Sequence, residues 1–111
     1  MIDLKLKNLG YLSYLNFILN DMDNLSNNLA ESHSILNALL KREDYLETVI
    51  IWLNLFGFLL CAYFNSEDLF QFIEVFDLIV QKNEKKLNID IFFKNYVFGK
   101  LYYFSHQLKK A

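Results

Sequence analysis

The chain has 111 residues, of which 54% are hydrophobic and 22% charged, and its formal net charge is −2. This length supports one hydrophobic core, so we expect a single domain over residues 1–111. The charge is small and no block of like charge is long, which argues against a disordered charged arm and against a polyelectrolyte partner.

The cysteine content and the first residues bear on the compartment. Cys61 is the only cysteine, so no intramolecular disulfide can form and a reducing compartment is the simpler expectation. Asp3 stands before any long apolar stretch and no small-residue cleavage site follows, which argues against a secretory signal. We therefore expect a cytoplasmic protein. Many Phe, Ile, Asn and Lys residues beside a single arginine are typical of an AT-rich genome.

Two short segments alternate apolar and polar residues. Residues 2–7 and 87–91 both have the period of a β-strand, and together they would form a small ribbon. The other interpretation is that they are the frayed ends of flanking helices. Because period alone is weak evidence over so few residues, we favour the helical ends.

Residues 9–40 have helical periodicity, with apolar residues recurring in steps of three and four. The pattern fits one long helix, or two helices broken at the polar cluster around residues 21–24. We favour the break, because this cluster is rich in poor helix formers and either Asp23 or Asn24 would cap a new helix. The apolar positions are Tyr11, Leu15, Ile18, Met22, Leu25, Leu29, Leu36 and Leu39.

Residues 45–64 form the most apolar stretch, and between Val49 and Phe64 only Asn54 and Gly57 are neither apolar nor aromatic. A helix that is apolar on every side is either the centre of a bundle or a membrane span. The span, at about 46–64, has a suitable length, but Asn54 and Trp52 in its middle count against it. We favour a central helix with Leu53 in the core, covered mainly by the polar-faced first, second and fourth helices.

The fourth helix is predicted over residues 67–82, with acidic residues in its first turn as the helix dipole favours. Its polar residues fall along one side at helical spacing, and two apolar residues stand among them. We interpret this side as a partner-binding surface, on which the apolar residues anchor and the carboxylates steer a basic partner. The predicted surface consists of Glu67, Phe70, Glu74, Asp77 and Leu78.

A turn at residues 83–86 precedes a last helix over about residues 90–109. Aromatic and apolar residues surround this helix and leave it no clean polar face. A small monomer has too little interior to hide such a helix, so we expect a homo-oligomer or a stable complex with another protein. Nucleic acid is a weaker expectation, because stacking platforms need their aromatics on one face.

No residue pattern indicates catalysis or a cofactor. Asp21 and Asp23 resemble the start of a calcium loop, but Ser26 and Ser32 stand where that loop needs glycine and glutamate. His33, His106 and Cys61 have no metal-ligand spacing, and we expect a core cysteine and two surface histidines. There is no glycine-rich phosphate loop.

These patterns predict an all-α bundle of four or five helices around a central apolar helix. The absence of catalytic groups favours a non-enzymatic protein-binding module. Our narrower hypothesis is a small inhibitor of a macromolecule: a bacterial immunity or antitoxin protein, or a phage-encoded anti-defence protein that blocks a nuclease. This step is a general expectation and does not follow from particular residues: small acidic proteins of AT-rich bacteria and phages often act in this way, and a target that handles nucleic acid tends to be basic. The alternative is a small membrane-embedded subunit with its span at about 46–64.

Overall fold

The computed structural model describes the backbone of residues 2–64, 67–87 and 90–110, and the side chains of these residues except 43 and 105–110. Every regular element in these ranges is a helix, which confirms the predicted all-α bundle. The elements are α1 (Ile2–Ile18), α2 (Met22–Leu39), the 3-10 turn η1 (Glu43–Tyr45), α3 (Leu46–Tyr63), α4 (Glu67–Lys82) and α5 (Ile91–Lys110).

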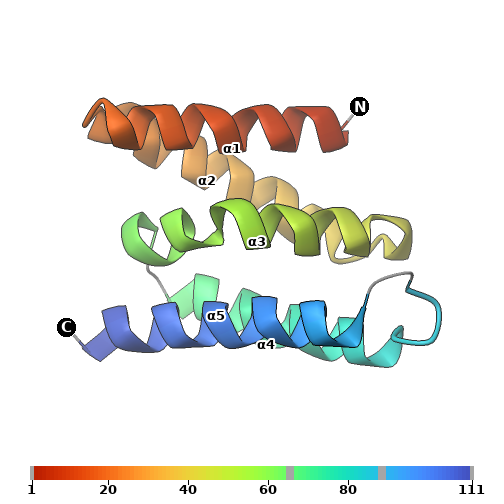
Figure 1. Ribbon diagram of the computed structural model, residues 1–111. Coiled ribbons are helices and arrows are strands. Elements are labelled where there is room, and N and C mark those ends of the chain that lie inside the picture. Colours follow the sequence, from red (N-terminus) through yellow and green to blue (C-terminus); the bar gives the residue numbers. More distant parts are fainter. Residues whose placement is uncertain (1, 65–66, 88–89, 111) are drawn as a thin grey trace.

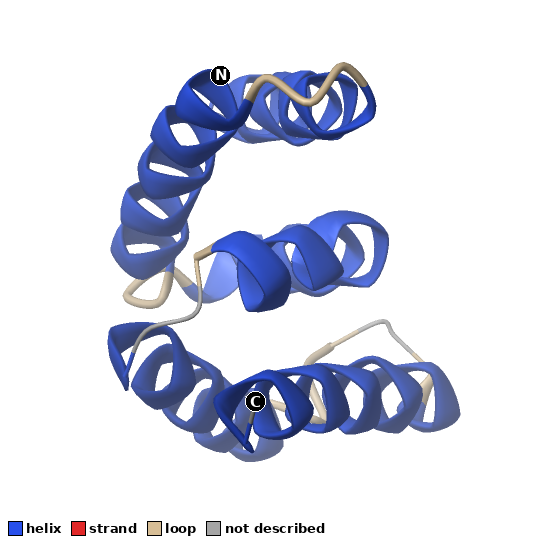
Figure 2. Cartoon of the chain, turned by 90° about the vertical axis from the view of Figure 1, so that its left-hand side faces the viewer, coloured by secondary structure: helices blue, strands red, loops and turns tan. Residues whose placement is uncertain are grey.

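The five α-helices form two layers. In Figure 1, α1, α3 and α5 lie one below the other and run in the same direction, while α2 and α4 return behind them. Figure 2 shows the same three levels from the side. The thinnest extent of the molecule is 21 Å, which fits two helix layers about 10 Å apart. As the middle helix of the front layer, α3 contacts all four of the other α-helices.

Residues 2–7 belong to α1, which confirms the favoured interpretation of this segment as the end of a helix and rules out the strand. A helix buries every third or fourth residue, and the buried face of α1 follows that spacing through Leu6, Leu9, Gly10 and Ser13. The alternation of apolar and polar residues therefore does not correspond to alternating burial, since Leu4 is half exposed while Leu6 is fully buried. Of residues 87–91, two lie outside the described residues and Ile91 begins α5.

The predicted break within residues 9–40 is confirmed between α1 and α2. Asn20 has a positive φ of 59°, a conformation that asparagine tolerates better than most residues. The Asp21 amide donates to the Asn16 carbonyl at 2.8 Å, and the Asn20 amide donates to the Phe17 carbonyl at 3.2 Å. These two bonds are the Schellman arrangement that satisfies the last carbonyls of a helix.

The N-cap of α2 is Asp21, and neither of the predicted caps, Asp23 and Asn24, takes this position. The Asp21 carboxylate makes no side-chain bond to the helix backbone; it accepts from the Asn24 side-chain amide at 2.7 Å. The cap prediction was wrong because the chain reverses at Asn20, three residues before Asp23, so that α2 already begins after Asp21.

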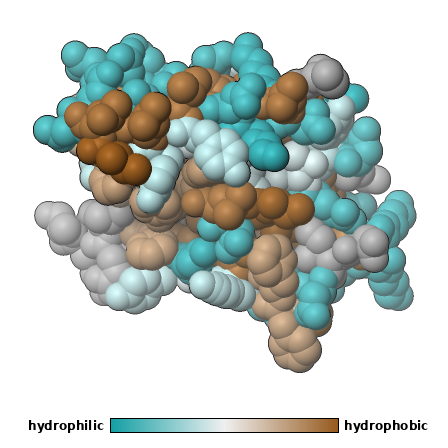
Figure 3. Space-filling view, turned by 45° about the horizontal axis from the view of Figure 1, so that its top comes forward, coloured by the Kyte–Doolittle hydropathy of each residue, from teal (hydrophilic) through white to brown (hydrophobic). Residues whose placement is uncertain are grey.

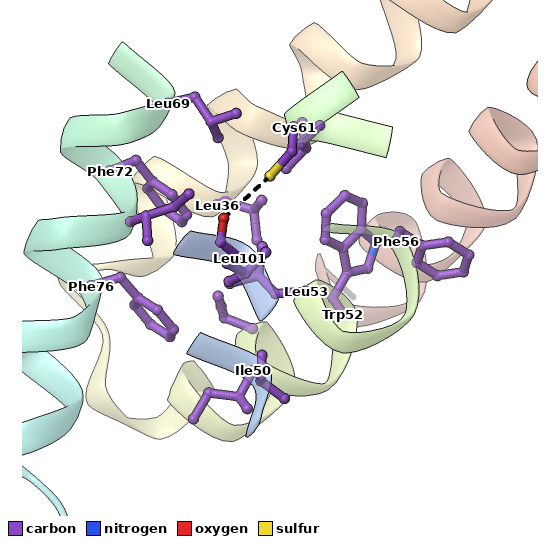
Figure 4. Packing of buried hydrophobic residues seen from close by; sticks show 14 of the residues in the cluster. Leu36, Ile50, Trp52, Leu53, Phe56, Cys61, Leu69, Phe72, Phe76 and Leu101 are labelled. Atoms are coloured by element: carbon purple, nitrogen blue, oxygen red, sulfur yellow. Dashed lines mark hydrogen bonds between the residues drawn. The ribbon is translucent and has the colours of Figure 1, made fainter. Parts of the chain in front are cut away.

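The core is built around α3, in which ten of the 18 residues are buried. Leu53 is 1% exposed, as predicted. Figure 4 shows Leu53 and Ile50 among side chains of α2, α4 and α5. The helix α5 covers α3 as closely as α1, α2 and α4 do, although the sequence predicted only these three as its main cover. The contact is made by Val97, Phe98 and Leu101, which are all buried. Within the described residues, α3 is the one helix long and apolar enough to cross a membrane, and 56% of its residues are buried inside the protein.

Two glycines set the distance between α3 and its neighbours in the front layer. A Cβ atom on Gly10 of α1 would lie 2.4 Å from two ring atoms of Phe56, and one on Gly57 of α3 would lie 2.6 Å from Leu101 Cδ2. Both distances are shorter than a van der Waals contact. The absence of a side chain at these positions therefore lets α1 and α5 pack closely against α3.

Candidate protein-binding surfaces

The five residues predicted to bind a partner form what we call the acidic ridge, Glu67, Phe70, Glu74, Asp77 and Leu78 of α4. Helical spacing places them along one side of this helix. Glu67 and Glu74 are exposed, and Leu78 is 58% exposed. Phe70 and Asp77 are half-buried. The ridge therefore offers an exposed leucine beside carboxylates, as the sequence suggested.

Asp77 connects the acidic ridge to α5. The Tyr102 hydroxyl donates to Asp77 Oδ2 at 3.1 Å, and Gln81 Nε2 donates to Asp77 Oδ1 at 3.3 Å. Burial, followed by the charge of Asp77, its hydrogen bond and the charge of Glu74, raises the pKa of Tyr102 to about 12. The sequence did not predict this contact, because no local pattern links two residues that lie 25 positions apart.

The carboxylates of α4 have no cation beside them within the described part of the chain. The ion pairs found there are Lys5–Glu31 at 3.0 Å and Lys94–Glu84 at 2.7 Å. Neither pair includes a residue of the acidic ridge. Within the described residues, Glu67, Glu74 and Asp77 thus keep a negative charge that no ion pair neutralises, although both oxygens of Asp77 accept hydrogen bonds.

A second surface lies between α1 and α3, and we call it the α1–α3 groove. Its volume is about 460 Å³, its walls carry Leu4 and Tyr11 of α1 and Ile51 and Leu55 of α3, and Leu6, Trp52 and Phe56 also line it. The four wall residues are each about half exposed. Figure 3 shows hydrophobic residues gathered across the middle of this side of the molecule. The central helix is thus not covered on every side.

Hydrogen bonds and ring contacts hold the lining of the groove in place. Trp52 Nε1 donates to the Leu6 carbonyl at 2.8 Å, which joins α3 to α1. The rings of Tyr11 and Phe56 meet edge to face at 5.2 Å. Because both contacts join separate helices, the shape of the groove depends on the spacing of α1 and α3.

On the other side of α3, Asn54 binds Lys100 of α5. Lys100 Nζ donates to Asn54 Oδ1 at 2.9 Å and to the Asn54 carbonyl at 3.2 Å, and lies 4.8 Å from the centre of the Tyr96 ring. This contact explains why the most apolar helix carries an asparagine at its centre: the amide and the carbonyl hold the cation of Lys100 between α3 and α5.

His33 is 8% exposed, so its predicted place on the surface is wrong. Its ring lies 4.9 Å from that of Phe64 and 5.6 Å from that of Phe72, where α2, α3 and α4 meet. Burial lowers its pKa below the ordinary value of 6.5, and the charge of Asp68 opposes that shift. The prediction failed because His33 shares the buried face of α2 with Leu29 and Leu36, four positions before and three after it. The side chain of His106 lies outside the described residues.

Cys61 has a buried, inert environment, as the sequence suggested. Its Sγ lies 3.9 Å from the Leu101 carbonyl, as Figure 4 shows. Burial raises the pKa of the thiol to about 11, so the nucleophilic thiolate is scarce at neutral pH. Among the described residues, no three His, Cys, Asp or Glu side chains gather closely enough to hold a metal ion.

Comparisons of this chain with protein-family models, with curated proteins and with solved structures find no match.

Proposed function

We propose that this protein is a non-catalytic binding module whose acidic ridge binds a basic protein. The observation that carries the proposal is Leu78, which is 58% exposed on the same side of α4 as three carboxylates that lack a cation partner within the described residues. Exposed apolar side chains within a charged surface are typical of binding sites, where they become anchors excluded from water. Phe70, already half-buried, loses little side-chain freedom when a partner covers it.

The carboxylates give the surface its selectivity. A basic partner is attracted from a distance, so association is fast at low salt and slows as salt screens the charges. Enzymes that act on nucleic acid carry basic surfaces for the phosphate backbone, and an acidic protein bound there blocks the substrate. We therefore propose an inhibitor of such an enzyme, in the class of bacterial immunity and antitoxin proteins or of phage anti-defence proteins.

The test uses the double variant Glu67→Lys/Glu74→Lys as bait in a lysate of the source organism. This variant leaves the Asp77–Tyr102 hydrogen bond intact. Its matched control is Asp23→Lys/Asp44→Lys, which makes the same change in net charge on exposed residues outside α4. Both variants replace one first-turn carboxylate, at Glu67 in α4 and at Asp23 in α2, so their helix-dipole costs are similar.

The expected result is that the parent and the control retain one basic nucleic-acid enzyme and inhibit it, whereas the ridge variant does neither. The association rate should also fall with rising salt. Equal capture by the ridge variant and the parent would overturn the proposal.

The alternative proposal is a small membrane-embedded subunit, and the length and apolar character of α3 favour it. A membrane subunit would require detergent to stay monodisperse and would enter the membrane fraction of the source cells. A protein that stays monodisperse without detergent supports the binding module instead.

A further inference from the structure

The front layer of helices exposes an apolar surface large enough for a protein interface. We call it the α1–α3–α5 face, and it extends the α1–α3 groove by three aromatic residues of α5. Tyr96 lies next to α3, because its ring contacts Lys100, which binds Asn54. Phe92 stands four positions before Tyr96 and Tyr103 seven positions after it, so all three lie on the same side of α5. The members of the face are Leu4, Tyr11, Ile51, Leu55, Phe92, Tyr96 and Tyr103, each between 49% and 80% exposed.

The area of this face suits a dimer. At roughly 200 Å² for a fully exposed side chain of this size, these seven residues leave on the order of 800 Å² open to water, which is about the area that each partner contributes to a standard protein interface. Monomeric proteins rarely expose contiguous apolar patches larger than a few hundred Å², and here only the Asn54–Lys100 contact lies between the groove and Tyr96 of α5.

The charges at the edge of the groove favour a second copy over a charged partner. Asp3 and Lys7 both line the groove, one helical turn apart on α1, and neither belongs to an ion pair in the described part of the chain. In a two-fold contact the same patch meets itself. If the two α1 helices run antiparallel, Asp3 of each copy faces Lys7 of the other.

The acidic ridge has the opposite character. Against a second copy of itself it would place carboxylates beside carboxylates, and like charges repel. Self-association is therefore favoured at the α1–α3–α5 face and disfavoured at the ridge.

We propose that two copies of this chain associate through the α1–α3–α5 face in a two-fold contact, with the α1 helices antiparallel. Each copy covers the other's exposed strip of α3, at Ile51 and Leu55. The acidic ridge belongs to α4, in the other layer of the molecule (Figure 1), so it stays free in this dimer.

The first experiment measures the mass of the full chain by light scattering and sedimentation equilibrium. The variant Ile51→Glu/Leu55→Glu should weaken dimerisation by more than about a hundredfold, because it buries two unpaired carboxylates at the centre of the contact. The control Leu12→Glu/Val75→Glu changes two residues that are similarly exposed but lie outside both the face and the acidic ridge, and it should remain a dimer. Circular dichroism and the emission of Trp52 verify that every variant is folded.

The second experiment tests the proposed pairing of the α1 helices. Asp3→Lys places lysine against lysine across the two-fold axis and should weaken the dimer by about tenfold. Adding Lys7→Asp restores opposite charges in reverse order and should restore most of the affinity. Failure of this rescue in a folded double variant would overturn the antiparallel arrangement.

A parent protein that is monomeric at its highest soluble concentration would overturn the proposal. The same monomer could float with vesicles of phosphatidylcholine and phosphatidylglycerol. If Ile51→Glu/Leu55→Glu abolishes that flotation, the face binds a membrane and the dimer proposal is overturned. Dimerisation unchanged by Ile51→Glu/Leu55→Glu would place the contact elsewhere. None of these measurements depends on the acidic ridge.

Discussion

The acidic ridge and the α1–α3 groove expose apolar side chains for different physical reasons. The ridge is a polar helix side that includes Leu78, and its charges all have one sign. The groove is a strip of an apolar helix that its neighbours leave open, with Asp3 and Lys7, of opposite sign, at its edge. Under our two proposals the partners differ with the charge: a surface of one sign attracts a basic protein, and a surface of balanced signs pairs with a copy of itself.

The largest expected effect comes from the core that both surfaces share. Leu53→Ala removes buried methyl groups from the centre of α3 and should lower the free energy of unfolding by about 2–5 kcal/mol. Denaturant titration followed by circular dichroism and by Trp52 emission should give one coincident transition. Separate midpoints would mean that the groove, where Trp52 lies, unfolds independently of the ridge.

A smaller loss of stability is expected when the contact between α1 and α3 at the groove is overpacked. Gly10→Ala places a methyl group against the Phe56 ring and should cost about 1–3 kcal/mol by overpacking, partly offset by the better helix propensity of alanine. The matched control is Gly99→Ala in α5, where a new Cβ has no neighbour within 4 Å.

The control should stabilise the protein by about 0.5–1 kcal/mol, because alanine favours the helix and nothing needs to move. Urea titration measures both variants, and Trp52 emission should change for Gly10→Ala alone. Equal effects at the two positions would show that α1 and α3 are not closely packed at Gly10.

The link between the ridge and α5 should contribute less. Tyr102→Phe removes the hydrogen bond to Asp77 and should cost about 1 kcal/mol at neutral pH. Because the folded-state pKa of Tyr102 is raised from 10 to about 12, its stabilising contribution is present below pH 10 and is lost as the pH rises towards 12. Urea titrations at neutral and alkaline pH should show this loss in the parent and not in the variant. Parallel pH profiles would contradict the contact.

The smallest expected effect is the response of His33 to acid, since a single buried group titrates. The folded-state pKa lies below the ordinary value of 6.5, so the unfolded chain binds the proton first. The contribution of His33 to stability should be constant above about pH 6.5 and fall as the pH drops towards the folded pKa.

His33→Phe removes this titration, so the difference in unfolding free energy between parent and variant should change between neutral pH and about pH 5. A constant difference over that range would show that His33 is solvated. The groove, which is remote from the place where α2, α3 and α4 meet, should give no separate response in Trp52 emission.

The sequence predicted the helices and the exposed residues of the ridge, but it misplaced the cap of α2 and did not predict the groove. The α4 boundaries, Glu67–Lys82, follow from an amphipathic pattern and an acidic first turn, and the same pattern identified Leu78. An all-round apolar helix carries no such signal. Which strip of α3 stays open depends on where α1 and α5 pack, and that depends on contacts such as Gly10 with Phe56 that no local pattern encodes. The burial of His33 was not predicted because histidine is polar, although its position in α2 falls on the same side as the apolar Leu29 and Leu36.

The buried position of Cys61 allows its reaction with a thiol reagent to report how often α5 separates from α3. Its sulfur is covered by α5 and approaches the Leu101 carbonyl, so a thiol reagent reacts only during intervals when α5 separates from α3. If closing is faster than the reaction, the labelling rate reports the equilibrium fraction of open molecules; at high reagent concentration it reports the opening rate itself. With one cysteine in the chain, each modified molecule records a single event at one known place, without any engineered probe.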